Sequence, residues 1–304
     1  MLNNPFVSHS DVPVAGGPLR VAHAGASVAD AESVVLAVHG ITASHLAWQA
    51  VGRDLVGDGR ICLLAPDLRG RGRSSTLPGP YGMSAHVDDL LAVLDELGAP
   101  PVVLGGHSMG AYVAALLAAD HPERVSKLVL VDGGLAIPVP SDTDPEELLA
   151  KTLGPALERL GVTFATRGDY LALWRNHPAL KDWWNDDVEA YVEYDVEAVD
   201  GDGVRSVVSP DAVSADSRAL LFDEETRTAI SRVRAPTWLL RSPRGLLNEE
   251  DRPLLPRDVL DEFVAAHPEA HVENVEGTNH YTLLLGDGPG PARVAAAFRS
   301  ALQR

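Results

Sequence analysis

Short aliphatic runs alternate with longer segments of helical periodicity along most of this 304-residue chain. The runs are rich in Val, Leu and Ile and are apolar on both faces, which is typical of strands that helices cover on both sides. This alternation predicts an α/β fold in which a mostly parallel, twisted sheet is flanked by helices. We expect strands at residues 33–38, 61–65, 102–104, 127–131, 237–240 and 271–275, and helices at 46–56, 85–97, 109–119, 259–266 and 292–302.

The alternation stops within residues 137–234, where the chain reads as helices and loops without a convincing buried strand. We therefore expect an α/β core formed by residues 1–136 and 235–304, into which residues 137–234 are inserted as a helical cap. The stretch from Ser141 to Glu225 carries 20 acidic and 7 basic residues. A solvated outer face explains such a charge run, and an electrostatic role in substrate choice is the alternative.

The predicted cap also holds three of the five tryptophans in the chain. A lid over a pocket needs an apolar underside, and the large ring of tryptophan supplies apolar area. Trp183 and Trp184 are therefore our candidates for substrate-binding residues. Packing inside the cap is the alternative interpretation of both.

The net charge of the chain excludes several classes of partner. It has 25 basic and 43 acidic residues, a net charge of −18 and a sequence pI of about 4.9. Such a protein repels phosphate backbones and anionic lipid surfaces, so we expect no nucleic-acid partner and no membrane partner. One cysteine, Cys62, cannot form an internal disulfide or a multi-thiolate metal site. The sequence shows no signal peptide and no spanning apolar run, so we expect a cytoplasmic protein.

The segment Gly106-His107-Ser108-Met109-Gly110 follows the predicted strand at 102–104 and opens the predicted helix at 109–119. A G-x-S-x-G pentapeptide becomes a strong signal when it lies on such a strand-to-helix turn. The glycines let strand and helix approach closely, and the turn raises the serine hydroxyl above the edge of the sheet. The start of the helix also places backbone N–H groups beside that hydroxyl.

With these residues the chain resembles the α/β-hydrolase superfamily over nearly its whole length. Three further segments are similar to the family's pattern: Val38-His39-Gly40-Ile41 to its oxyanion turn, Pro66 to Ser74 to the loop after the next strand, and Gly277-Thr278-Asn279-His280 to its catalytic-histidine turn. The insertion at 137–234 falls where such enzymes carry their cap. The resemblance also implies the chain order serine, acid, histidine.

The resemblance implies a role for each site residue. Ser108 is the expected nucleophile, and His280 is the expected base, since an imidazole with an ordinary pKa of about 6.5 exchanges protons near neutrality. The expected oxyanion donors are the backbone N–H groups of Ile41 and Met109. His107 and His39 are expected to have structural roles, His39 as a brace for the oxyanion turn.

The acid of the triad is where the sequence departs from the commonest pattern of the family. Most relatives place it after the strand that corresponds to 237–240, but the turn from Arg241 to Leu247 has no carboxylate. A minority use the end of the preceding strand, where this chain has Asp132, and ligands bind at the carboxyl ends of strands in open parallel sheets. We therefore expect Asp132 to be the triad acid. The alternatives are one of the acids at 249–251 or no acid at all; those three residues are Glu249, Glu250 and Asp251.

These expectations indicate a serine hydrolase that cleaves a carboxylic ester or lactone through an acyl-enzyme. We expect no cofactor and no metal, because no cluster of ligand residues has metal-binding spacing. The expected partner is a small, neutral, fairly apolar substrate. The alternatives are a hydrolase of carbon–carbon bonds in diketones, an amidase or peptidase, and a non-catalytic ligand receptor of the same fold. Dehalogenation and epoxide opening are disfavoured, because those relatives carry aspartate at the position of Ser108.

Overall fold

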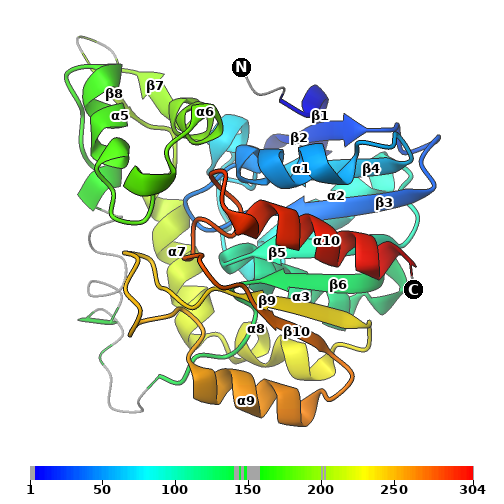
Figure 1. Ribbon diagram of the computed structural model, residues 1–304. Coiled ribbons are helices and arrows are strands. Elements are labelled where there is room, and N and C mark those ends of the chain that lie inside the picture. Colours follow the sequence, from blue (N-terminus) through cyan, green and yellow to red (C-terminus); the bar gives the residue numbers. More distant parts are fainter. Residues whose placement is uncertain are drawn as a thin grey trace.

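The computed structural model describes residues 4–139, 144, 147–148, 158–199, 201 and 203–303. Its main feature is an eight-stranded sheet with the order β1-β2-β4-β3-β5-β6-β9-β10 (Figure 1). The strands from β4 to β10 in this order pair in parallel, whereas the β1–β2 and β2–β4 pairs are antiparallel. The bounds are β1 Phe6–Val14, β2 Gly17–Gly25, β3 Ser33–Val38, β4 Ile61–Pro66, β5 Val102–His107, β6 Val125–Val131, β9 Thr237–Arg241 and β10 His271–Asn274.

The six strands that we expected from the sequence are all present in this sheet, so the predicted mostly parallel α/β fold is confirmed. Their continuous apolar runs reflect burial on both faces, and every residue of β4 and β5 is buried. The sequence analysis missed the hairpin of β1 and β2. Most residues of β1 are polar or exposed because the strand lies at the edge of the sheet, so it lacks the aliphatic pattern of a buried strand.

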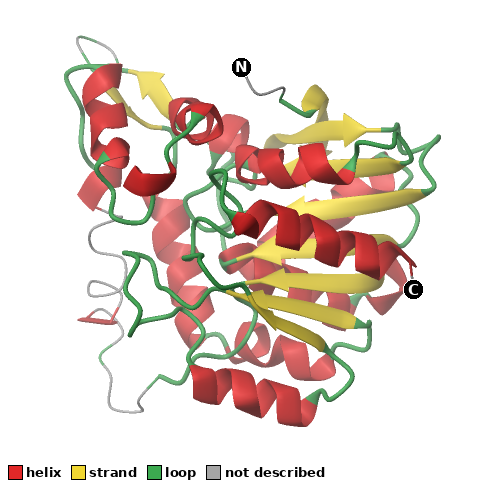
Figure 2. Cartoon of the chain, viewed as in Figure 1, coloured by secondary structure: helices red, strands yellow, loops and turns green. Residues whose placement is uncertain are grey.

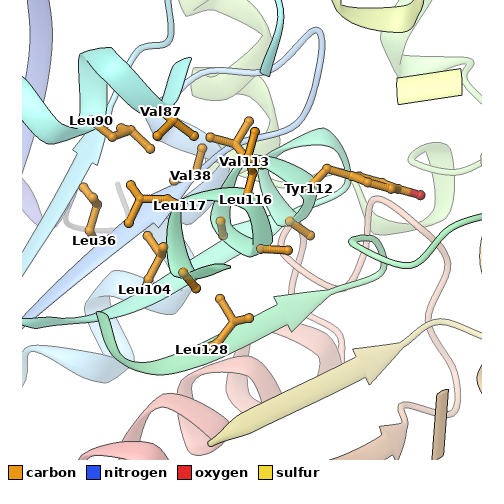
Figure 3. Packing of buried hydrophobic residues seen from close by; sticks show 14 of the residues in the cluster. Leu36, Val38, Val87, Leu90, Leu104, Tyr112, Val113, Leu116, Leu117 and Leu128 are labelled. Atoms are coloured by element: carbon orange, nitrogen blue, oxygen red, sulfur yellow. The ribbon is translucent and has the colours of Figure 1, made fainter. Parts of the chain in front are cut away.

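Helices cover both faces of the sheet, and alternate residues of each central strand point to opposite sides. In β3, Leu36 belongs to the core on the side of α2 (Met83–Glu96) and α3 (Met109–Asp120). The next residue, Ala37, belongs to the core on the side of α1 (Gln49–Leu55) and α10 (Pro289–Gln303). Figure 3 shows the first of these cores, where leucines and valines of α2 and α3 pack on β3, β5 and β6.

The described elements between β6 and β9 are mostly helical (Figure 2). Those within residues 158–208 lie beyond one end of the sheet, whereas the helix at 224–228 packs against α3 on one face of the sheet. The described elements include α5 Arg167–Arg175, α6 Asp186–Tyr194, β7 Val196–Ala198, β8 Val204–Ser206, α7 Pro210–Phe222 and α8 Glu224–Thr228. The interpretation of this segment as helices and loops missed β7 and β8, which form a small antiparallel sheet. Each has three residues, too few for a clear alternation in the sequence. Residues 140–143, 145–146, 149–157, 200 and 202 of the predicted cap lie outside the described residues.

Helix α9, Arg257–Ala266, packs Val259 and Phe263 into the core on the same side of the sheet as α3. Together with α1, α2, α3 and α10 it accounts for each helix that we expected in the α/β core. Within the part of the chain that the structure describes, no helix is both long and apolar enough to cross a bilayer.

Candidate active site

Ser108 lies on the tight turn between β5 and α3, where its backbone adopts φ 55° and ψ −122°. A positive φ is uncommon for a residue with a side chain, and it persists only where the surrounding structure enforces it. The neighbouring strand β6 supplies part of that constraint, because the N–H of Ser108 donates to the carbonyl oxygen of Val131 at 3.0 Å. The half-buried serine is the N-cap residue of α3 and therefore lies at the positive end of that helix.

Three glycines allow this turn because a Cβ atom at any of them would strike backbone. A Cβ on Gly106 would lie 2.1 Å from the carbonyl oxygen of Gly110, and one on Gly110 would lie 2.2 Å from that of Val38. A Cβ on Gly133 would lie 2.4 Å from the carbonyl oxygen of Ser108. The G-x-S-x-G spacing thus follows from the close contact of α3 with the ends of β3 and β5.

Replacing Gly110 with alanine tests this contact. Alanine is better than glycine in a helix by about 1 kcal/mol, so propensity alone predicts a more stable protein. The clash with the Val38 carbonyl acts in the opposite direction, and we expect it to dominate with a net loss of roughly 3 kcal/mol in the free energy of unfolding. Urea denaturation measures the change. The control is Gly57→Ala, because Gly57 is exposed and a Cβ added there would come no closer than 3.8 Å to a neighbouring atom; equal stabilities of the two variants would contradict the prediction.

His280 contacts Asp132 through its Nδ1 atom, which lies 2.7 Å from Oδ2 of the carboxylate. Both residues are buried, and Asp132 follows β6 directly with φ 47°. The other carboxylate oxygen, Oδ1, accepts the backbone N–H of Ser242 at 3.1 Å. Because the carboxylate accepts a hydrogen bond from Nδ1–H, the proton of a neutral His280 lies on Nδ1 and its Nε2 atom is left as an acceptor.

The alternative acids lie at residues 249–251, and the contacts of Glu249 and Glu250 are with residues 244–247 of the same segment. Glu249 accepts the N–H of Leu247 at 2.9 Å, and Glu250 forms an ion pair with Arg244. Asp251 is exposed. Asp132 is therefore the candidate acid whose carboxylate the structure brings to His280.

His107 links the serine turn to the histidine turn. It precedes Ser108 in the chain, its Nε2 lies 3.0 Å from the carbonyl oxygen of His280, and the two rings are 4.6 Å apart. Burial lowers the pKa of His107 well below its usual value, so the ring is neutral and its Nε2–H donates to that carbonyl. This bond places the backbone of His280 beside the turn that carries Ser108.

The turn after β3 lies against Ser108, since a Cβ on Gly40 would be 3.3 Å from the Cβ of Ser108. His39 holds this turn: its Nε2 accepts the N–H of Leu68 at 3.0 Å, and its Nδ1–H donates to the Gly40 carbonyl at 2.7 Å. Burial lowers the pKa of His39 to about 4, which keeps the ring neutral for both bonds. The Gly40 carbonyl and the Ile41 N–H belong to one peptide group, and in a trans peptide they point in opposite directions. By binding the carbonyl, His39 therefore also sets the direction of the Ile41 N–H.

Met109 is the first residue of α3, and its side chain is buried. The first N–H groups of an α-helix have no acceptor within the helix, so they are free to bind an anion at this end. The backbone N–H groups of Ile41 and Met109 therefore belong to the two segments that flank Ser108.

Trp183 and Trp184 have described contacts with other parts of the protein. Trp183 packs on the turn before α10, where Cβ atoms on Gly286 and Gly288 would lie 3.1 and 2.9 Å from it. The indole N–H of Trp184 donates to Glu189 at 3.1 Å. These contacts give no support to a substrate-binding role, which stays a prediction.

Buried charges join the insertion to the core. Asp67, which follows β4, accepts the hydroxyl of Tyr194 from α6 at 2.7 Å. Burial raises the pKa of Asp67, but its contact with His45 and the amide N–H groups of His45 and Arg73 outweigh this and lower it to about 2. Asp187 of α6 accepts a guanidinium N–H of Arg53 from α1 at 3.1 Å. Ionised side chains therefore hold α6 against the core.

Sequence reasoning missed three groups around this site: the amide of Ser242, the close approach of Gly133 to Ser108, and a buried ion pair of Arg71 with Asp216. Arg71 lies in the segment at 66–74 that resembles the family's pattern, so the sequence pointed to this loop but not to the partner of Arg71. Ser242 and Asp216 belong to no local pattern, because their partners are distant in the chain. Among the described residues, no group of three or more His, Cys, Asp or Glu side chains is arranged to hold a metal ion.

The sheet order defines an open α/β protein, and the turn between its central strand β5 and helix α3 carries Ser108. A family model described as the alpha/beta hydrolase fold matches residues 33–287. The chain therefore belongs to the α/β-hydrolase fold family, and the resemblance seen in the sequence is confirmed.

Matches to curated relatives cover only part of the chain. Lipase LipV of Mycobacterium tuberculosis is 42% identical over 103 residues, which are 34% of this chain and 38% of the lipase. Epoxide hydrolase 2 of Siraitia grosvenorii is 34% identical over 125 residues, which are 40% of this chain and 38% of that enzyme. The chain thus aligns with well under half the length of these relatives.

Solved structures match the chain over nearly its full length. A structure of E-2-(acetamidomethylene)succinate hydrolase superposes with a TM-score of 0.77 at 21% identity, covering 98% of this chain and 99% of the other. A thermophilic esterase from Thermogutta terrifontis superposes with a TM-score of 0.66 at 21% identity, covering 98% of each chain. At these identities the likeness shows the shared fold.

Proposed function

We propose that this protein is a serine hydrolase that cleaves a carboxylic ester or lactone through an acyl-enzyme. The observation that carries the proposal is the 2.7 Å contact between His280 and Asp132, beside the strained turn of Ser108. A serine next to a histidine that a carboxylate orients is the combination that activates a hydroxyl at neutral pH. The partial identity with a lipase supports the same class of substrate.

In the first half of the proposed reaction, Oγ of Ser108 attacks the ester carbonyl carbon while Nε2 of His280 takes the hydroxyl proton. The carbonyl oxygen becomes an oxyanion, which the N–H groups of Ile41 and Met109 stabilise. Asp132 holds the imidazole in the required tautomer and balances its positive charge. His280 then donates its proton to the leaving oxygen, the C–O bond breaks, and an alcohol departs from the acyl-enzyme.

In the second half a water molecule attacks the acyl carbon, and His280 takes one of its protons. When the second tetrahedral intermediate collapses, the bond to Oγ breaks and His280 returns the proton to Ser108. The carboxylic acid product leaves, and the enzyme is restored. A lactone follows the same steps, but its alcohol and acid remain in one molecule.

We propose that the substrate is small, neutral and fairly apolar near the scissile bond. Leu160, Val208 and Val213 of the insertion form a buried apolar cluster, and Ile41 packs against it. An apolar acyl group beside the oxyanion turn would therefore meet apolar side chains of the insertion, where an unpaired charge would be costly.

Two measurements on the same protein test the proposal. A fluorophosphonate probe is expected to modify Ser108, with the adduct located by mass spectrometry of peptides. A panel of a p-nitrophenyl ester, a lactone, a vinylogous diketone and an anilide is expected to show turnover of the first two. Labelling without turnover of any panel member would point to a ligand receptor, and preference for the diketone or the anilide would replace the ester proposal.

A further inference from the structure

Arg71 is a fully buried arginine that connects three separate parts of the protein. It lies between β4 and α2, and its Nη1 atom donates to the carbonyl oxygen of Arg69 at 2.9 Å within its own loop. A guanidinium with no access to water must be matched by an opposite charge and by acceptors. The positions of those partners show what the residue holds together.

One partner of Arg71 is the oxyanion turn. The Nε–H of Arg71 donates to the carbonyl oxygen of Ile41 at 2.8 Å. His39 donates to the carbonyl of Gly40, so the peptide groups on both sides of the Ile41 Cα are held by side chains. With both peptide planes restrained, the N–H of Ile41 keeps one direction relative to Ser108.

A third partner of Arg71, and the charged one, comes from the insertion. Asp216 of α7 is fully buried, and its Oδ2 lies 2.6 Å from Nη1 of Arg71. Asp216 is itself held by the core, since it lies 3.0 Å from Nε2 of His86 and accepts the N–H of Gly82 at 2.7 Å. Helix α7 therefore reaches the oxyanion turn through one side chain of the core.

The start of α7 rests on the loop that carries Arg71. The N–H of Ser209 donates to the Gly70 carbonyl at 2.9 Å, and a Cβ on Gly70 would lie 2.6 Å from the side chain of Ala212. Gly70 has φ +80°, a conformation that favours glycine. This close docking sets the distance at which Asp216 meets Arg71.

We propose that Arg71, held by Asp216, is a positioning residue for the oxyanion donor Ile41, so that docking of α7 and assembly of the oxyanion site are coupled. This inference rests on the proposed function, in which the Ile41 N–H binds the oxyanion. Geometric errors of about 1 Å at such a donor reduce rates by up to about 100-fold. If the ion pair only stabilised the fold, its removal would lower the free energy of unfolding, but the folded variant would keep the kcat of the wild type.

Arg71→Lys is the sharpest test, because lysine keeps the positive charge for Asp216 but has no N–H at the position of Nε. We expect kcat for a p-nitrophenyl ester to fall roughly 10- to 100-fold while KM changes less than about threefold, since the contact acts on the transition state. The double variant Arg71→Met with Asp216→Asn removes both charges at similar volume and is expected to show the same pattern. Wild-type kcat in either variant would overturn the proposal.

The matched control is the other ion pair between insertion and core. The double variant Arg53→Met with Asp187→Asn removes a contact of α6 with α1 that does not touch the oxyanion turn. We expect its kcat to stay within about threefold of wild type, because Ile41 keeps its restraints. An equal loss of kcat in this control would show that docking of the insertion in general, and not Arg71, controls the rate.

Crystal structures of the variants separate this inference from the proposed function. If the wild-type protein turns over no ester, the proposed function has failed, but the orientation of the Gly40–Ile41 peptide, which carries the Ile41 N–H, can still be compared. We expect that peptide to rotate in Arg71→Lys and in the double variant at this site and to keep its orientation in the control. An unchanged peptide at full occupancy would overturn the positioning role whatever the activity.

Discussion

Ser108→Ala is expected to reduce kcat for a p-nitrophenyl ester on the order of 10⁶-fold, to the background of the preparation. Without Oγ no acyl-enzyme can form, and His280 and Asp132 have no hydroxyl to activate. The fold is expected to persist, because alanine differs from serine by one atom that is not required for packing of the turn. Steady-state release of p-nitrophenol measures the loss, and circular dichroism checks the fold.

The control for this prediction is Ser126→Ala. Ser126 lies near the start of β6, at the opposite end of the strand from Asp132, and its hydroxyl donates to the carbonyl of Val102 at 2.9 Å. Its removal is expected to leave kcat unchanged, since it is remote from the β5–α3 turn. Substantial turnover by Ser108→Ala, equal to that of the control, would rule out the acyl-enzyme route and with it the proposed function.

Asp132→Asn is expected to lower kcat by about 10³- to 10⁴-fold. Asparagine keeps the shape of the side chain and can still accept the N–H of Ser242, so the turn after β9 should stay in place. Its amide nitrogen cannot accept from Nδ1 of His280, however, which favours the tautomer with the proton on Nε2. That tautomer cannot take the proton of Ser108, and its charged form loses its counter-ion.

Asp251→Asn is the matched comparison, because Asp251 is exposed beyond the turn after β9 and is one of the three acids that the sequence left as alternatives. We expect it to retain wild-type kcat under the same assay. The reverse result, with a large loss in Asp251→Asn and little in Asp132→Asn, would move the acid to the later turn. Such a result would also require that turn to approach His280 in a different arrangement.

The departure from the common pattern has a structural counterpart in the turn after β9. Residues 241–247 of that turn hold no carboxylate, and the N–H of Ser242 in it donates to Asp132. The end of β6 and the turn after β9 are neighbours, because the two strands pair in parallel. A carboxylate at either strand end can therefore reach the histidine turn, and here the β9 turn supports the carboxylate of β6.

The buried part of the fold was predictable because its signal is local. Strands covered on both faces need continuous apolar runs, and those runs located six strands of the sheet. The hairpin of β1 and β2 and the short pair of β7 and β8 lacked such runs, since they lie at an edge or span three residues each. Their strand conformation depends on pairing partners and not on their own periodicity.

In the candidate site, too, the features that depend on local contacts were predictable and those that depend on distant contacts were not. The position of Ser108 follows from Gly106 and Gly110, whose spacing is required by contacts within a few residues or with an adjacent strand. Trp183 shows the opposite case. Its backbone and ring pack against the turn at Gly286 and Gly288, about a hundred positions further along the chain, and no pattern near Trp183 in the sequence indicates this contact. Its substrate-binding role stays a prediction.

The sequence alone determined the α/β architecture and the strained serine turn, because backbone geometry at glycine and the period of apolar residues are encoded within short stretches. Only the tertiary structure decided which carboxylate meets His280 and which arginine restrains Ile41. Asp132 lies 148 positions from His280, and Asp216 comes from the insertion. Contacts of that range are set by strand order and by docking of α7, neither of which leaves a pattern at the residues themselves.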